Sequence, residues 1–172
     1  MVENSVVLKF IQTVNGSLVS AERVMLIALT AAIAIIMMVQ VVLRYFFSAP
    51  LFWAEEISTQ LLVFVTLFGM SMSVHQGALV SIDFLTRVLS GRRRHVLKAL
   101  LGSVMLVLFV FIAWLGWQWM MRPEVRMELV GTTQLPRWYN YVALPLAMTM
   151  MAWHQFAAIL RELRAIGRGV AS

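Results

Sequence analysis

The chain contains no cysteine, and only 13% of its 172 residues are charged. Without cysteine it forms neither a disulfide framework nor a thiolate metal site. Its three histidines are scattered and stand beside no carboxylate cluster, which argues against a zinc site. A soluble domain carries about a quarter charged residues. The low charge, together with 61% hydrophobic residues, therefore indicates an integral membrane protein.

Residues 1–23 lack the basic start and the small-residue cleavage site of a signal peptide. Apolar residues recur there at helical spacing between polar ones, a pattern typical of a helix that lies in the membrane interface. The formal net charge of +6 would suit nucleic acid. However, the basic residues stand in loops and tails between apolar runs, where lysine and arginine set membrane orientation. No nucleic-acid partner is therefore expected.

Four apolar runs are each long enough for the roughly 20 residues that cross a hydrocarbon core. We expect an all-α integral membrane protein with four transmembrane helices and a short helical cytoplasmic loop that begins near Ser81 or Asp83. The expected segments are an N-terminal interfacial amphipathic helix at 1–23, a membrane domain at 24–160 with spans at about 24–43, 53–75, 96–121 and 138–160, and a basic tail at 161–172.

The distribution of positive charge predicts the orientation. The two chain ends and the middle loop, with its flank, hold ten of the fourteen Lys and Arg residues, and the other two loops hold four. Because cytoplasmic loops are enriched in these residues, both termini are expected in the cytoplasm. Arg92, Arg93 and Arg94 form the densest run, which is expected to set topology or to contact lipid headgroups.

The outer end of the first hairpin concentrates charge and aromatic rings. Arg44 ends the first span, and Glu55 and Glu56 begin the second. Aromatic residues there, including Tyr45, Phe52 and Trp53, are typical of a membrane interface. Arg44 is expected to pair with one of the two glutamates or with a charge on a partner. The alternative is that it snorkels independently to the headgroups.

The second span also carries small and hydroxyl residues at steps of three and four, among them Thr59, Thr66 and Gly69. Such residues let helices approach closely and form hydrogen bonds across the contact. This stripe predicts a packing face for another helix.

Several functional classes find no support in the residues. We find no nucleophile–base pair and no phosphate loop, so an enzyme is not expected, and no cofactor is predicted. No span has a central Gly/Pro break, and no repeat relates the two halves, in contrast to secondary transporters. His154 is expected to hydrogen-bond locally. The residues favour an accessory membrane subunit whose polar faces meet a partner.

Two other classes stay open. A small four-helix multidrug exporter would need a carboxylate deep in its first span, where the expected span has none. The membrane anchor of a redox complex would need facing histidines for haem, and His75 and His154 are its span-end candidates.

An ordered set of short motifs runs through most of the chain. It consists of Arg44-Tyr45, Pro50-Leu51, Trp53-Ala54-Glu55-Glu56, Gly69, Gly77-x-x-x-x-x-Asp83 and Leu135-Pro136-x-Trp138-x-x-Tyr141-x-x-x-Pro145. Over roughly residues 24–160 the chain resembles the small membrane subunit of tripartite ATP-independent periplasmic (TRAP) transporters, the DctQ-like family. One departure is Leu79, where members of that family often carry histidine.

The resemblance implies a mechanism that the residues alone do not give. A large multispanning TRAP subunit would carry the substrate and sodium sites and move the substrate by an elevator-like motion. A soluble periplasmic binding protein would deliver an organic acid. This chain would pack against the static scaffold of the large subunit in the bacterial inner membrane and contact membrane lipids. Its external surface is expected to help dock the binding protein through Phe52, Glu124, Arg126 and Glu128.

Overall fold

The computed structural model describes residues 3–77 and 92–168. Their helices are α1 (Glu3–Phe46), α2 (Ala54–His75), α4 (Arg92–Met120), α5 (Pro123–Met127), α6 (Trp138–Tyr141) and α7 (Ala143–Arg168). Four stretches among the described residues have the length and apolar composition to cross a membrane: Ile11–Phe46, Ala54–His75, Arg93–Met120 and Trp138–Gly167. The expected all-α membrane fold with four spans is confirmed.

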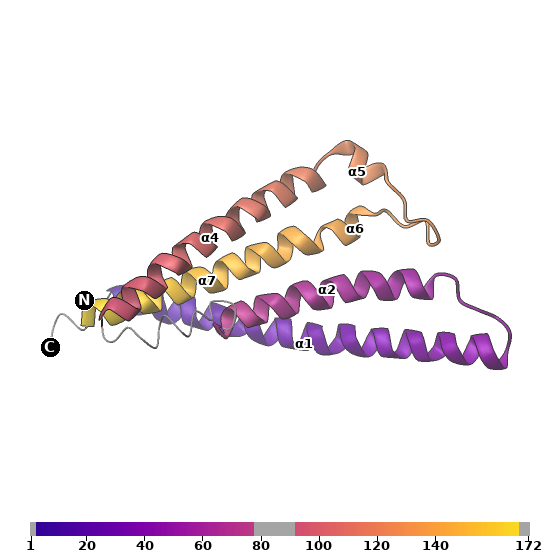
Figure 1. Cartoon of the computed structure of the whole chain (residues 1–172), viewed down its shortest axis with the longest axis horizontal. Coiled ribbons are helices and arrows are strands. Elements are labelled where there is room, and N and C mark those ends of the chain that lie inside the picture. Colours follow the sequence, from indigo (N-terminus) through magenta and orange to yellow (C-terminus); the bar gives the residue numbers. More distant parts are fainter. Residues whose placement is uncertain (1–2, 78–91, 169–172) are drawn as a thin grey trace.

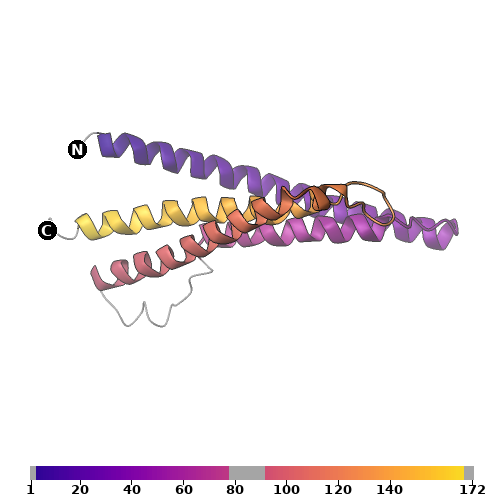
Figure 2. The ribbon, with the colours of Figure 1, turned by 90° about the horizontal axis from the view of Figure 1, so that it is seen from above.

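The helices pack as two pairs that meet through α2 and α7. α1 runs along α2, α4 runs along α7, and α2 also contacts α7. Figure 1 shows the helices spreading apart toward the end that carries α5 and the α1–α2 connection, while both chain ends lie at the opposite end. Seen from above in Figure 2, it is α1, α7 and α4 that fan out near the chain ends. The pairs therefore cross rather than run parallel.

The apolar core lies where α2, α4 and α7 meet. Its buried residues are Val74, Phe109, Ala113, Ala147, Met148 and Met151. Glycine allows the close approach of α4 to α7, because a Cβ added at Gly116 would lie 3.1 Å from the Cβ of Pro145. By contrast, a Cβ added at Gly69 would meet no atom within 4 Å, so the predicted α2 stripe makes no close approach within this chain.

Two expected boundaries do not coincide with helix ends. α1 continues without a break across residues 23 and 24, because its first half packs on the bundle through Asn15 and Glu22, whose partners lie on α2 and α7. α7 continues past residue 161, where Glu162 is bonded to His95 of α4 at 2.6 Å. The helix expected near Ser81 and Asp83 lies outside the described residues.

Candidate functional site

At the end of the hairpin where α1 connects to α2, the two helices are joined by a hydrogen bond. Gln40 of α1 is only 6% exposed, and its Nε2 donates to Oε1 of Glu55 at 3.1 Å. Its other amide atom, Oε1, is buried and has no partner. The first acidic residue of α2 is thus held by an amide on α1.

The second acidic residue joins the hairpin to the loop between α5 and α6. Oε2 of Glu56 accepts a hydrogen bond from the backbone N–H of Thr132 at 3.1 Å. The loop is itself ordered by two further backbone bonds, from Val130 N–H to the Leu135 carbonyl at 2.9 Å and from Arg137 N–H to the Glu128 carbonyl at 2.8 Å. Glu56 therefore connects α2 to a structured external turn.

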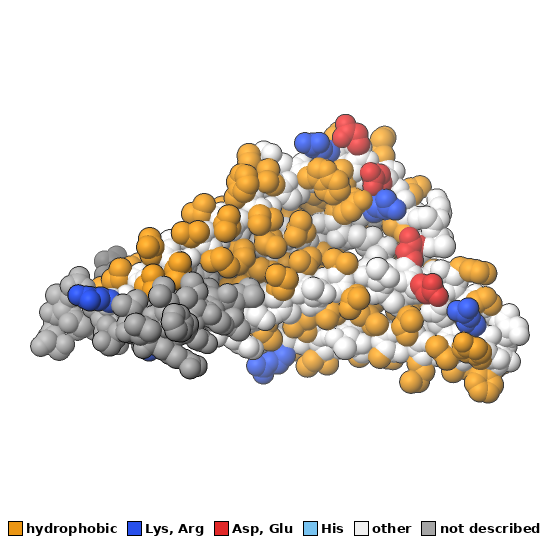
Figure 3. Space-filling model, in the orientation of Figure 1, with side chains coloured by type: hydrophobic (Ala, Val, Ile, Leu, Met, Phe, Trp, Pro, Cys, Tyr) orange, Lys and Arg blue, Asp and Glu red, His pale blue; other side chains and the backbone are white. Residues whose placement is uncertain are grey.

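Acidic and basic side chains are interspersed along this edge of the molecule, as Figure 3 shows. Glu128 has partners within the chain, since its Oε2 lies 3.6 Å from Nη1 of Arg137 and accepts from the Tyr141 hydroxyl at 3.1 Å. Glu124 is exposed, and exposed Arg126 donates to the sulfur of Met121. Phe52, the apolar one of the four residues expected to dock a binding protein, is 79% exposed.

Arg44 lies at the same end but makes no intrachain ion pair. Its side chain is exposed, and within the described residues no ion pair joins it to Glu55 or Glu56. The expected pairing of Arg44, with a glutamate or with a partner, stays a prediction. Gln40 and the Thr132 amide each bond one oxygen of these two carboxylates. Tyr45 and Trp53 beside it are also exposed.

The α2 stripe lines a groove opposite α4, α6 and α7. The hydroxyls of Thr59 and Thr66 donate to the carbonyls four residues earlier, at 2.8 and 2.9 Å, and not across a helix contact. Both residues line an apolar groove of about 500 Å³ whose far wall includes Trp119, Tyr141 and Leu144. Within this chain the expected interhelical hydrogen bonds are absent from these two residues, and the face is left open.

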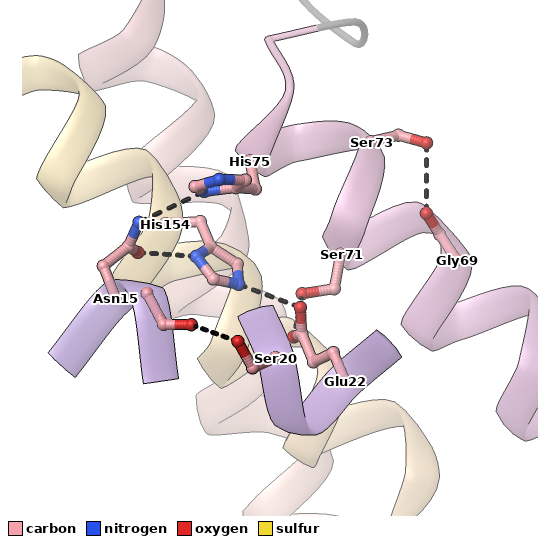
Figure 4. A network of polar contacts seen from close by, with 9 residues as sticks. Asn15, Ser20, Glu22, Gly69, Ser71, Ser73, His75 and His154 are labelled. Carbon is pink, nitrogen blue, oxygen red and sulfur yellow. Dashed lines mark hydrogen bonds and ion pairs between the residues drawn. The ribbon is translucent and has the colours of Figure 1, made fainter. Parts of the chain in front are cut away.

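A buried polar cluster joins three helices near the other end (Figure 4). Glu22 of α1 is 0% exposed and His154 of α7 is 1% exposed. Oε1 of Glu22 accepts from the Ser71 hydroxyl at 2.7 Å, and Oε2 lies 3.1 Å from Nε2 of His154. Asn15 then bridges the two histidines, with Oδ1 2.7 Å from Nδ1 of His154 and Nδ2 3.1 Å from Nδ1 of His75.

The donors and acceptors fix most protons of this cluster. With the Asn15 amide in this orientation, its oxygen only accepts, so Nδ1 of His154 is the donor. Its nitrogen only donates, so Nδ1 of His75 is the acceptor. One more proton lies between His154 and Glu22, on the ring or on the carboxyl group, and in either state this pair carries no net charge. Both ring nitrogens of His154 are engaged, which leaves neither for a haem iron.

This geometry corrects two expectations. His154 does not bond locally, since its partners lie more than one hundred positions away in the chain. Glu22 lies inside the candidate span Ile11–Phe46, so the first span does contain a carboxylate. That carboxylate is not open to solvent, because it is fully buried and bonded to Ser71 and His154.

Comparison with known proteins identifies the family. The model of the DctQ component of tripartite ATP-independent periplasmic transporters matches residues 33–165, most of the chain. The chain belongs to this family. The DctQ match includes the outer edge and His154, whereas Asn15 and Glu22 precede it.

Two curated relatives of this DctQ chain are informative. The sialic acid TRAP transporter small permease protein SiaQ of Vibrio cholerae is 26% identical over 143 residues, which are 83% of this chain and 82% of that protein. The sialic acid TRAP transporter permease protein SiaT of Haemophilus influenzae is 34% identical over 78 residues. That second match covers 45% of this chain but only 13% of the longer protein.

Two of the remaining predicted positions of the DctQ chain lie at the end opposite to the α1–α2 connection. Arg93 and Arg94 are exposed at the start of α4, as expected of residues that contact headgroups or solvent. Arg92 begins the helix. Asp83 lies outside the described residues.

Proposed function

We propose that this chain is the scaffold subunit of a sodium-coupled TRAP transporter for organic acids, and that it holds a large transport subunit in the bacterial inner membrane. The observation that carries the proposal is the DctQ match over residues 33–165 on a chain with four candidate spans. The chain itself leaves much of its apolar surface uncovered. In the most apolar 18-residue stretch of α1, only 6% of the residues are buried. Lipid and a partner would cover the rest.

The proposed partner is a large multispanning permease. Its support is the SiaT match, because a segment similar to this chain occurs there within a much longer permease polypeptide. When two segments are fused in one protein and occur as separate chains in another, the separate chains are expected to form a complex. The sialic acid named for both relatives belongs to the organic acids, the substrate class we propose.

We assign the α2 stripe and its groove to the contact with the large subunit. Thr66→Trp would fill the groove, so we expect loss of co-purification with the large subunit while the chain still folds. Val107→Trp is the matched control, since Val107 is exposed on α4 away from this groove, and it should co-purify normally. Equal retention in both variants would contradict the assigned face.

Arg44 would then find its counter-charge on the large subunit. An unpaired charge in a low-dielectric contact is much costlier than a paired one, so Arg44→Glu should weaken assembly. Normal co-purification and transport by Arg44→Glu would instead support independent snorkelling.

Transport by the complex tests the function itself. Proteoliposomes that hold the large subunit, with the binding protein outside, should take up a sugar acid along a sodium gradient only when this chain is present. Undiminished uptake without the chain would overturn the scaffold role. Proton-coupled efflux of cationic drugs by the chain alone would support the exporter alternative.

The external edge is proposed to dock the periplasmic binding protein. Glu124 and Arg126 are the better probes there, because reversal of Glu128 would also break its bonds to Arg137 and Tyr141. Glu124→Lys and Arg126→Glu should slow association, most strongly at low salt. Arg94→Glu, at the opposite end, is the control. Unchanged association of both outer variants at low salt would remove the proposal.

A further inference from the structure

A cavity of about 390 Å³ lies between the end of α2, the start of α4 and the last turns of α7. Its polar lining includes His75, Lys98, Gln155 and Arg161, and its apolar lining includes Val74 and Ile159. His75 is the last residue of one candidate span, and Lys98 and Arg161 lie within two turns of the ends of two others. The cavity is therefore at the level where hydrocarbon gives way to headgroups.

Among the described residues, the cavity lining carries more positive than negative charge. Neither Lys98 nor Arg161 forms an ion pair with any described residue. Glu162 also lines the cavity, but its carboxylate is bonded to Nδ1 of His95 at 2.6 Å. Two cations against one already bonded carboxylate leave the lining with a net attraction for an anion.

Gln155 provides an independent indication of a ligand. Its side chain lines the cavity and is only 5% exposed, yet no hydrogen bond joins it to another described residue. Its amide atoms are not among the fully buried ones that lack a partner, so the amide is accessible to a molecule in the cavity, to which it can donate or from which it can accept. Water would satisfy the amide but would bring no counter-charge for Lys98 and Arg161.

We propose that this cavity binds the headgroup of an anionic phospholipid from the leaflet at this end of the bundle. The lipid phosphate would lie between Lys98 and Arg161, and the Gln155 amide would donate to a lipid oxygen. The apolar residues Val74 and Ile159 suit the glycerol and the first methylenes. Basic pockets between transmembrane helices bind lipid headgroups in this way. The proposal does not depend on the transport function.

Native mass spectrometry of the full chain in detergent tests this inference. Dioleoyl phosphatidylglycerol should bind more tightly than dioleoyl phosphatidylcholine, whose headgroup has no net charge. Lys98→Gln and Arg161→Gln should each weaken phosphatidylglycerol binding by about fivefold, the effect of one cation near a lipid surface. Arg93→Gln and Arg94→Gln are matched controls, because these exposed cations do not line the cavity.

Further measurements distinguish this lipid site from general surface attraction and from a site for free anions. Gln155→Leu should weaken binding without changing the net charge. Equal losses in the control variants would mean general surface attraction and would overturn the site, as would equal binding of the two lipids to the unaltered chain. Inorganic phosphate should not displace the lipid at matched concentration. Displacement would show a free-anion site and would also overturn the lipid assignment.

Discussion

At the residue scale, the contact between Glu22 and His154 joins the beginning of the chain to its last helix. A buried acid–base pair contributes little net stability, because the cost of removing both groups from water offsets their attraction. Removal of only one partner is much more costly, since it leaves the other buried and uncompensated. The pair is therefore expected to determine which helices pack together more than it stabilises the bundle.

His154→Ala is predicted to destabilise the chain by roughly 3–5 kcal/mol, the usual cost of breaking a buried pair. The measurement is chemical unfolding in detergent, followed by tryptophan fluorescence. The control is the double variant Glu22→Leu/His154→Leu, which removes both polar groups and should recover most of the loss. If the double variant unfolds as easily as His154→Ala, the penalty comes from lost packing rather than from an unpaired carboxylate.

Glu56→Ala is predicted to loosen the external turn without unfolding the bundle. It removes the acceptor of the Thr132 amide, so amide exchange at 130–134 should become about fivefold faster, for a bond that contributes ~1 kcal/mol. Hydrogen exchange with mass detection measures this. Glu55→Ala is the control, because Glu55 bonds Gln40 and not the turn. Equal acceleration in both variants would show that the turn is not held by Glu56.

At the element scale, close helix approach occurs on α4 and not on the α2 stripe. Gly116 faces Pro145 with no room for a side chain, whereas Gly69 faces open space. Substitutions at the two glycines therefore distinguish packing within the chain, at Gly116, from packing against another molecule, at Gly69.

Gly116→Leu is predicted to destabilise the isolated chain by about 1–3 kcal/mol, because the added atoms would force α4 away from α7. Gly69→Leu should leave the stability of the isolated chain nearly unchanged and should instead weaken co-purification with the large subunit. Chemical unfolding and co-purification measure the two effects. Loss of intrachain stability in Gly69→Leu would contradict an open α2 face.

The sequence allowed the spans to be predicted, because long apolar runs and turn residues are local signals. The structured turn after Pro123 was also predictable from its Gly, Pro and hydroxyl residues. The buried cluster was not, because Asn15 and Glu22 have the same local pattern as polar residues of an interfacial helix. Their partners are 49 to 139 positions away, and no local spacing identifies such pairs. Nor does a stripe of small residues specify which neighbour it meets.

At the scale of the whole molecule, the described chain has two chemically different ends. One end carries interspersed acids and bases around ordered turns (Figure 3). The other end carries both chain ends (Figure 1) and is rich in lysine and arginine, among them Arg93, Arg94 and Arg161. This asymmetry predicts a single orientation in the membrane.

The orientation can be measured directly, because the chain has no cysteine of its own. Glu124→Cys is predicted to react with a membrane-impermeant maleimide added to cells with a permeable outer membrane. Gly167→Cys should react only after the inner membrane is opened. The reverse pattern would contradict cytoplasmic termini.

The unbroken course of α1 has a mechanical consequence. Its 44 residues make a rod about 66 Å long at 1.5 Å per residue, more than twice the ~30 Å hydrocarbon thickness. A helix of this length tilts in the bilayer or projects from it. Because α1 is continuous from Glu3 to Phe46, its two ends are expected to move together. A force on α1 before Asn15 would act on the bundle through the bonds of Asn15 and Glu22 and, along the same helix, on the Gln40–Glu55 bond near its other end.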